Sequence, residues 1–200
     1  MSQVKSNINS LFNSISYRID NILIDPGDEW EGMDNVDAVL LTHAHFDHIY
    51  GLNRVIEKNP NAKVYTNDYG AQMLVNSKKN LSKYHGTPFT FNNTENIVIV
   101  NDNDEIEFSD IIKPKAIFTP GHNPSCITWI IKNYMFTGDS YIPGIKIVTN
   151  IPQADKELAA ESLYKIMRLA TIRYIYPGHK IDYDYTLKYS RLEFNLPKKL

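Results

Sequence analysis

The sequence predicts an α/β fold in which short strands alternate with helices. Residues 38–41 form a continuous apolar run, which is typical of a strand buried on both faces of a sheet. Residues 155–170 instead repeat apolar side chains at helical spacing, among them Ala159, Leu163 and Ile166, and this pattern predicts an amphipathic helix. Strand and helix patterns follow one another along the chain, so we expect β-sheets covered by helices.

The other elements are predicted from periodicity and from turn residues. Residues 14–19 and 22–25 are expected to be strands joined by a tight Asp20-Asn21 turn. Further strands are expected at 97–101, 105–108, 112–118, 126–131 and 134–136, and in a run that ends at Tyr176. Helices are expected at 47–58, 67–79, 155–170 and, as a short last one, 183–194, with residues 196–200 fraying.

The composition excludes several classes of partner. The 200 residues carry 21 Lys and Arg against 23 Asp and Glu, so no basic surface for nucleic acid or an anionic membrane is expected. A single cysteine excludes an internal disulfide framework. The start lacks an apolar signal segment and no apolar run could span a membrane, so we expect a cytoplasmic protein. We expect one domain over residues 1–200 and a small-molecule substrate, with the oligomeric state left open.

A cluster of metal-ligand residues follows the apolar run 38–41. It has the pattern HxHxDH and consists of His43, His45, Asp47 and His48. Neutral imidazole and ionised carboxylate are ligands that first-row divalent metals prefer, and chance seldom gathers them this densely. While the chain stays extended, the first two histidines point to one side, and the last two residues can then aim at a second point nearby. This divergence suggests two metals rather than one.

Three more candidate ligands stand at predicted strand ends. His122 and His179 each follow a Pro-Gly pair, which turns the chain sharply and offers the histidine on a loop. Asp139 follows the strand predicted at 134–136 in the same way. His85 follows no such strand, and we interpret it as a surface or loop histidine.

On these motifs the chain resembles the metallo-β-lactamase superfamily, and within it the glyoxalase II-like branch of small hydrolases. The resemblance runs from about residue 22 to residue 179 and rests on HxHxDH, TPGH, TGDS and YPGH in the family's order. The segment Ile22-Leu23-Ile24-Asp25-Pro26-Gly27 also looks like the family's early strand and acidic turn. The resemblance implies a four-layer αβ/βα sandwich, with two mixed β-sheets face to face and helices outside.

The resemblance also implies a dinuclear centre. Its two metals would be held by loop ligands, the first by His43, His45 and His122, and the second by Asp47, His48 and His179, with Asp139 bridging. A hydroxide bridging the metals would be the nucleophile, because zinc-bound water has a pKa of about 7. Asp47 would also be catalytic, since its carboxylate could orient this hydroxide. Zinc is the metal expected first, with iron or manganese as alternatives.

Four functions fit this centre. The first is a dinuclear hydrolase of a small ester-like bond, a thioester or a lactone. The second is a mononuclear non-heme iron persulfide dioxygenase that would use His43, His122 and Asp139, a two-His-one-carboxylate triad. A nuclease of the same superfamily is disfavoured by the missing basic surface, and a non-catalytic metal-binding protein by the intact ligand set.

Residues near the centre suggest substrate contacts. Tyr141 and Lys146 follow the bridging aspartate, and Lys180 follows the last histidine, so each is a candidate for binding a substrate oxygen or anionic group. Glyoxalase II carries a further helical region that contacts glutathione, whereas only about twenty residues follow His179 here. Whether a glutathione-linked substrate such as hydroxyacylglutathione is used is therefore left open.

Overall fold

The computed structural model describes residues 3–28, 30–108 and 112–180, and it contains two β-sheets. The first sheet has the strand order β1-β2-β3-β4-β5-β6. Its strands are β1 (Lys5–Ile8), β2 (Ile15–Ile19), β3 (Ile22–Ile24), β4 (Ala38–Leu40), β5 (Lys63–Thr66) and β6 (Ile97–Ile99). The pairs β1·β2 and β2·β3 are antiparallel, and the pairs from β3 to β6 are parallel. The sheet is therefore mixed.

The second sheet has the order β10-β9-β8-β7 and is also mixed. Its strands are β7 (Lys115–Phe118), β8 (Ile127–Ile131), β9 (Tyr134–Gly138) and β10 (Tyr174–Pro177). The first three form an antiparallel meander, and β10 joins parallel to β9 after the long helix α3 (Lys156–Ala170). This parallel step brings the end of β10 beside the end of β9.

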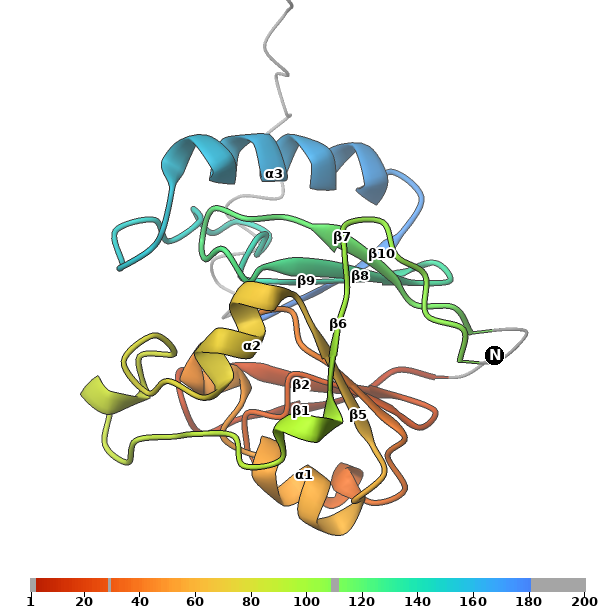
Figure 1. Cartoon of the computed structure of the whole chain (residues 1–200). Helices are drawn as coiled ribbons and strands as arrows, with labels where there is room; N and C mark the ends of the chain where they lie inside the picture. Colours follow the sequence, from red (N-terminus) through yellow and green to blue (C-terminus); the bar gives the residue numbers. More distant parts are fainter. Residues whose placement is uncertain (1–2, 29, 109–111, 181–200) are drawn as a thin grey trace, which may run out of the picture.

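The two sheets lie face to face with helices on their outer faces (Figure 1). Alternation along β3 explains this arrangement, because Ile22 and Ile24 enter the core between the sheets, whereas Leu23 faces the other way. On the outer face of the first sheet, α1 (Leu52–Lys58) and α2 (Asp68–Leu74) pack against it. Helix α3 packs against the outer face of the second sheet. The predicted four-layer sandwich with two mixed sheets is confirmed.

Trp129 ties the two sheets together close to the predicted metal ligands. Its side chain is fully buried between the sheets, and its indole Nε1 donates a hydrogen bond of 2.8 Å to the carbonyl of Leu41. The neighbouring amide of Ile127 donates to the carbonyl of Thr42 at 2.7 Å. Strand β8 therefore fixes the point at which the chain leaves β4.

The helix predicted at 155–170 is confirmed as α3. Asp155 caps it, because its carboxylate accepts from the amides of Glu157 and Leu158, and the buried Ala159 and Ile166 form the predicted stripe.

Two predicted helices are shorter than expected. The helix predicted at 47–58 is a single 3-10 turn, Phe46–His48, followed by α1. The amide of Gly51 donates to the carbonyl of Pro26 at 2.7 Å instead of continuing a helical ladder, so the chain breaks there. The helix predicted at 67–79 is α2, which ends at Leu74. The amide of Phe91 donates a hydrogen bond to the carbonyl of Leu74, which the next turn of a longer helix would need.

Several observed strands also differ from the predicted ones. The strand predicted at 105–108 is wrong, since this segment makes only an isolated bridge between Glu105 and Lys115. Those predicted at 97–101 and 112–118 are the shorter β6 and β7, and Pro114 explains the late start of β7 because it has no N–H to donate. Strands β1 and β5 were not predicted. The expected features at 183–194 and 196–200 lie outside the described residues.

Three further 3-10 turns complete the described elements, at Glu31–Met33, Ser82–Tyr84 and Thr94–Asn96. Within the described ranges, none of the helices has the length and apolar character that crossing a membrane would require.

Candidate metal centre

The predicted ligands stand on four loops at the carboxyl ends of strands. The HxHxDH cluster follows β4, and the other three, His122, Asp139 and His179, follow β7, β9 and β10. The structure brings all four loops to one end of the sandwich, where the ligand side chains are within contact distance of one another. Each segment was predicted to end its strand and then present a ligand, and each does so.

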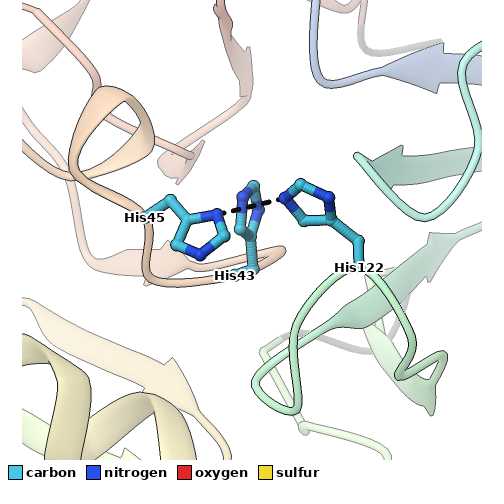
Figure 2. Close-up of side chains that lie close together, drawn as sticks. All are labelled: His43, His45 and His122. Carbon is cyan, nitrogen blue, oxygen red and sulfur yellow. Dashed lines mark hydrogen bonds between the residues drawn. The ribbon is translucent and has the colours of Figure 1, made fainter. Parts of the chain in front are cut away.

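Three imidazoles form the first group of candidate ligands. The ligand nitrogens of His43, His45 and His122 all lie within 4.8 Å of one another (Figure 2). His45 Nδ1 and His122 Nε2 are 3.1 Å apart, and Figure 2 shows their rings pointing toward each other. Two nitrogens bound to one tetrahedral zinc would stand about 3.3 Å apart, so this spacing suits a shared ion.

The second group consists of Asp47, His48 and His179. The Nε2 atoms of the two histidines are 3.4 Å apart. Asp47 Oδ2 lies 3.5 Å from the His48 nitrogen and 3.4 Å from the His179 nitrogen. One imidazole from each of two distant segments and one carboxylate thus converge on a second point, as the resemblance implied.

Asp139 lies between the two groups. Its Oδ2 atom is 3.5 Å from His122 Nε2, in the first group, and 3.3 Å from His179 Nε2, in the second. Its Oδ1 atom is 3.5 Å from His48 Nε2. Gly178 permits this position, because a Cβ at residue 178 would collide with Asp139 Oδ1. A carboxylate in this place can contact an ion in either group.

The ring nitrogens that face away from the cluster are held by the protein. Fixed acceptors receive hydrogen bonds from Nδ1 of three histidines: His48 to Asp25 Oδ2 at 3.0 Å, His122 to the carbonyl of Val148 at 2.9 Å, and His179 to the carbonyl of Phe12 at 2.9 Å. These bonds orient each ring and direct Nε2 into the cluster. Such anchoring is characteristic of metal-binding histidines.

Asp25 is a candidate supporting residue whose contacts were not predicted from the sequence. Its carboxylate is buried and accepts from the Thr42 amide at 2.7 Å, the Thr42 hydroxyl at 2.5 Å and His48. Thr42 Oγ1 is in turn 3.3 Å from His43 Nδ1. Asp25 therefore supports a histidine of each group. The acidic turn after 22–24 was the available signal, but nothing in the sequence showed which side chains it would reach.

Asn123 and Ser125 hold the His43–His45 segment. Asn123 Nδ2 lies 3.2 Å from His45 Nε2, and its Oδ1 accepts from the Ser125 hydroxyl at 2.7 Å. Ser125 Oγ then accepts from the amide of Ala44 at 3.1 Å. The next residue, Cys126, is fully buried, and burial raises the pKa of its thiol to about 12, so it is unsuited to act as a nucleophile.

The two groups differ in their protonation without metal. Burial lowers the pKa of His45 to about 3 and holds that of His43 well below its usual value. Burial also opposes the charged form of His48, but the carboxylates of Asp47 and Asp25 outweigh it and raise the pKa of His48 to about 10. His43 and His45 are therefore unprotonated at neutral pH, whereas His48 retains a proton.

Metal binding at the second group is expected to release protons. Because the pKa of His48 is raised to about 10, this ring is protonated below that pH, and a metal must displace the proton. We therefore expect affinity at the second group to rise as the pH increases through neutrality, with about one proton released per ion bound there. Calorimetric zinc titrations in buffers of different ionisation enthalpy would measure this number. Release of no proton at pH 7 would contradict the assignment of His48.

The predicted substrate contacts have different surroundings. A small pocket beside the cluster is lined by His122 and Asp139 and by the loop residues Ile142, Ile145, Lys146, Ile147 and Val148. Lys146 is exposed at this pocket, as expected of a substrate contact. Lys180 is also exposed, and its amide donates to the carbonyl of Asn13 at 2.9 Å.

Tyr141 has apolar surroundings. It is partly buried and packs against the core cluster that contains Ile117, Met135 and Ile166, and it is not among the described residues that line the small pocket. Its role as a substrate contact stays a prediction. His85, interpreted as a surface histidine, is exposed and stacks on Phe46 with ring centroids 4.5 Å apart.

Comparison with known proteins gives a consistent family. A family model described as the metallo-beta-lactamase superfamily matches residues 16–179. The metallo-beta-lactamase fold-containing protein ST1585 of Sulfurisphaera tokodaii is 28% identical over 152 residues, which cover 68% of this chain and 58% of that protein. Glyoxylase B2 of Dictyostelium discoideum is 26% identical over 70% of this chain and 48% of its own length. The chain thus spans only about half of these two relatives.

A probable metallo-hydrolase of Methanocaldococcus jannaschii, MJ0888, is 29% identical over 84% of this chain and 88% of that protein. Among solved structures, TTHA1623 in a di-iron-bound form has a TM-score of 0.76 at 21% identity, covering 88% of this chain and 92% of that one. ETHE1 from Myxococcus xanthus has a TM-score of 0.66 at 21% identity, covering 90% and 76%. These structural likenesses concern the fold.

Proposed function

The chain belongs to the metallo-beta-lactamase superfamily, and on that premise we propose that it is a metal-dependent hydrolase of a small thioester or lactone, in the glyoxalase II-like branch. The observation that carries this proposal is the pair of ligand groups joined by Asp139. In each group at least one imidazole donates a hydrogen bond from Nδ1 to an acceptor outside the cluster. Two metal ions per chain are the natural occupants of such a pair.

The side chains present fit these ions. His43 Nε2 and Asp139 Oδ1 are buried polar atoms without a hydrogen-bond partner, which is costly unless another species binds them. Imidazole and carboxylate donors suit zinc, iron and manganese alike. Zinc is the metal we propose, with iron as the first alternative, since one protein of similar fold has a di-iron-bound form.

The residues of the centre would divide the work of hydrolysis. Bound divalent ions would supply Lewis acidity and a water of lowered pKa, about 7 in catalytic zinc sites. Asp139 would offset the repulsion between the two positive centres, because its carboxylate lies between the groups. Asp47 lies beside His48 and His179, and its carboxylate would orient the attacking water and accept its proton.

The pocket beside the centre has a volume of about 20 Å³, little more than one water molecule needs, so its walls rather than its interior would contact the substrate. Its apolar side chains, Ile142, Ile145 and Val148, suit the hydrocarbon part of a small acyl compound, and Lys146 suits a polar or anionic end. Lys180 is a second candidate for that end. A small molecule is therefore the proposed partner, and the net charge of −2 argues against nucleic acid or an anionic membrane.

The test begins with the metal content of protein expressed without added metal and purified without chelator or a His-tag. About two zinc ions per chain, or two of mixed zinc, iron and manganese, are expected. The same protein should hydrolyse members of a panel of thioesters and lactones under anaerobic conditions, and lose this activity after chelation. A protein with two metals that cleaves none of the panel would count against the proposed substrate class.

The alternative is a mononuclear iron persulfide dioxygenase that uses His43, His122 and Asp139. One contact favours it, since Asp139 Oδ2 is 3.5 Å from His122 Nε2 and could share an ion with the first group. A content of about one iron per chain, with oxygen consumed in the presence of a persulfide, would support this function.

A further inference from the structure

The second ligand group is held from behind by the loop 9–14, which joins β1 and β2. The carbonyl of Phe12 accepts from His179 Nδ1 at 2.9 Å, and the carbonyl of Asn13 accepts from the amide of Lys180 at 2.9 Å. Ser14 forms an isolated antiparallel bridge with His179. The segment that follows β10 is thus paired with this loop through its backbone.

The Ser14 side chain reaches the other segment of the same group. Its hydroxyl, which is fully buried, donates to the backbone carbonyl of Asp47 at 2.7 Å. Asn9 Nδ2 donates to the same hydroxyl at 3.0 Å, which leaves the hydroxyl proton for Asp47. Ser14 therefore touches the segments of Asp47 and His179 at once, one through its side chain and one through its backbone.

The first group has different supports. The loop after β4 is held by the second sheet and its connections, through the bond from the Ile127 amide to the Thr42 carbonyl and the bond from the Ala44 amide to Ser125. His122 Nδ1 donates to the carbonyl of Val148. The described contacts of the first group thus come from β8, the loops around it and, through Thr42, from Asp25. Those that hold Asp47 and His179 of the second group include the contacts of loop 9–14.

We propose that Ser14 is a positioning residue of the second metal site, so that loop 9–14 sets the affinity of the second metal and leaves the first unaffected. This inference rests on the proposed two-metal centre. Ser14 lies behind the ligands rather than among them. Its effect would arise because it fixes the distance between Asp47 and His179, whose facing atoms are 3.4 Å apart.

The test measures zinc binding by Ser14→Ala. Isothermal titration gives the two affinities, and elemental analysis after dialysis gives the zinc retained per chain. Loss of a residue that orients a ligand typically weakens a metal about 10–100-fold. We expect this loss for the second zinc and an unchanged affinity for the first, so that dialysed Ser14→Ala retains about one zinc where the unaltered protein retains about two. Ser82→Ala is the matched control, because Ser82 is equally buried and hydrogen-bonds only to backbone away from the ligands.

Two results would overturn the inference. One is Ser14→Ala with both zinc affinities unchanged, and the other is an equal loss at both sites. Circular dichroism of the metal-free variant checks that it folds. If it does not, Asn9→Ala decides, since it removes the donor to Ser14, together with an acceptor for Ser16 and Asn7, and should weaken the second zinc to a lesser degree. A protein that binds zinc as expected but cleaves no thioester or lactone would instead contradict the proposed function alone.

Discussion

Replacing Asp139 with alanine is expected to remove at least one metal ion per chain and to slow hydrolysis by about a thousandfold or more. Its carboxylate lies within 3.5 Å of imidazole nitrogens in both ligand groups. Metal-based stabilisation of a transition state is worth several kcal/mol, and about 1.4 kcal/mol corresponds to a tenfold change in rate. Loss of the carboxylate between two positive centres should remove most of this transition-state stabilisation.

Elemental analysis and kinetics on the same preparation measure both effects. Asp139→Asn keeps the shape and removes the charge, so it should resemble Asp139→Ala if charge is what matters. Asp155→Ala is a suitable control, because it removes a carboxylate that caps α3 and should cost about 1 kcal/mol of stability without changing metal content. If Asp139→Ala retained two metals and full activity, the bridging role would be wrong.

The electrostatics of the metal-free protein explain why Asp139 should matter so much. Burial alone would raise its pKa, but the hydrogen bond from His179 and the charge of His48 hold it well below its usual value. The carboxylate is therefore ionised across the whole physiological range. It balances the positive charge of His48, and it would balance the charge of bound metal ions.

The positions of the candidate ligands at strand ends could be predicted from the sequence because each depends on local information. A strand must end where Pro-Gly stands, and a histidine after that turn is offered at the sheet edge wherever the strand lies in the sheet. His122 and His179 follow this rule. The strands β1 and β5 escaped prediction because their pairing with distant strands, and not an apolar pattern, decides their structure.

The supports behind the ligands could not be predicted in the same way. Val148 and Phe12 act through their backbone carbonyls, which every residue possesses, so no residue type marks them. Asp25 is marked by type, but its contact with His48 depends on how the loops after β3 and β4 cross. The packing of Tyr141 against the core cluster beside α3 could not be predicted either, since its nearness to Asp139 in sequence says nothing about these distant residues.

Replacing His179 with alanine is expected to separate the two candidate functions. His179 belongs to the second group only, with Nε2 at 3.4 Å from both His48 and Asp47. A dinuclear hydrolase should lose the second metal and at least about a hundredfold in activity, as removal of a ligand costs no less than removal of a group that orients one. An iron enzyme built on His43, His122 and Asp139 should keep its iron and most of its oxygen consumption.

His179 is a better choice for this experiment than His48, although both belong to the second group. His48 is fully buried and donates to Asp25, so His48→Ala would strand a buried carboxylate and destabilise the fold. The His179 side chain is 17% exposed, and the partner of its Nδ1 atom is a backbone carbonyl, which water can satisfy in the variant. His85→Ala, at an exposed histidine outside both groups, controls for the loss of an imidazole. Because the fold should survive, lost activity with one metal retained would identify a two-metal enzyme, and retained oxygen consumption a one-iron enzyme.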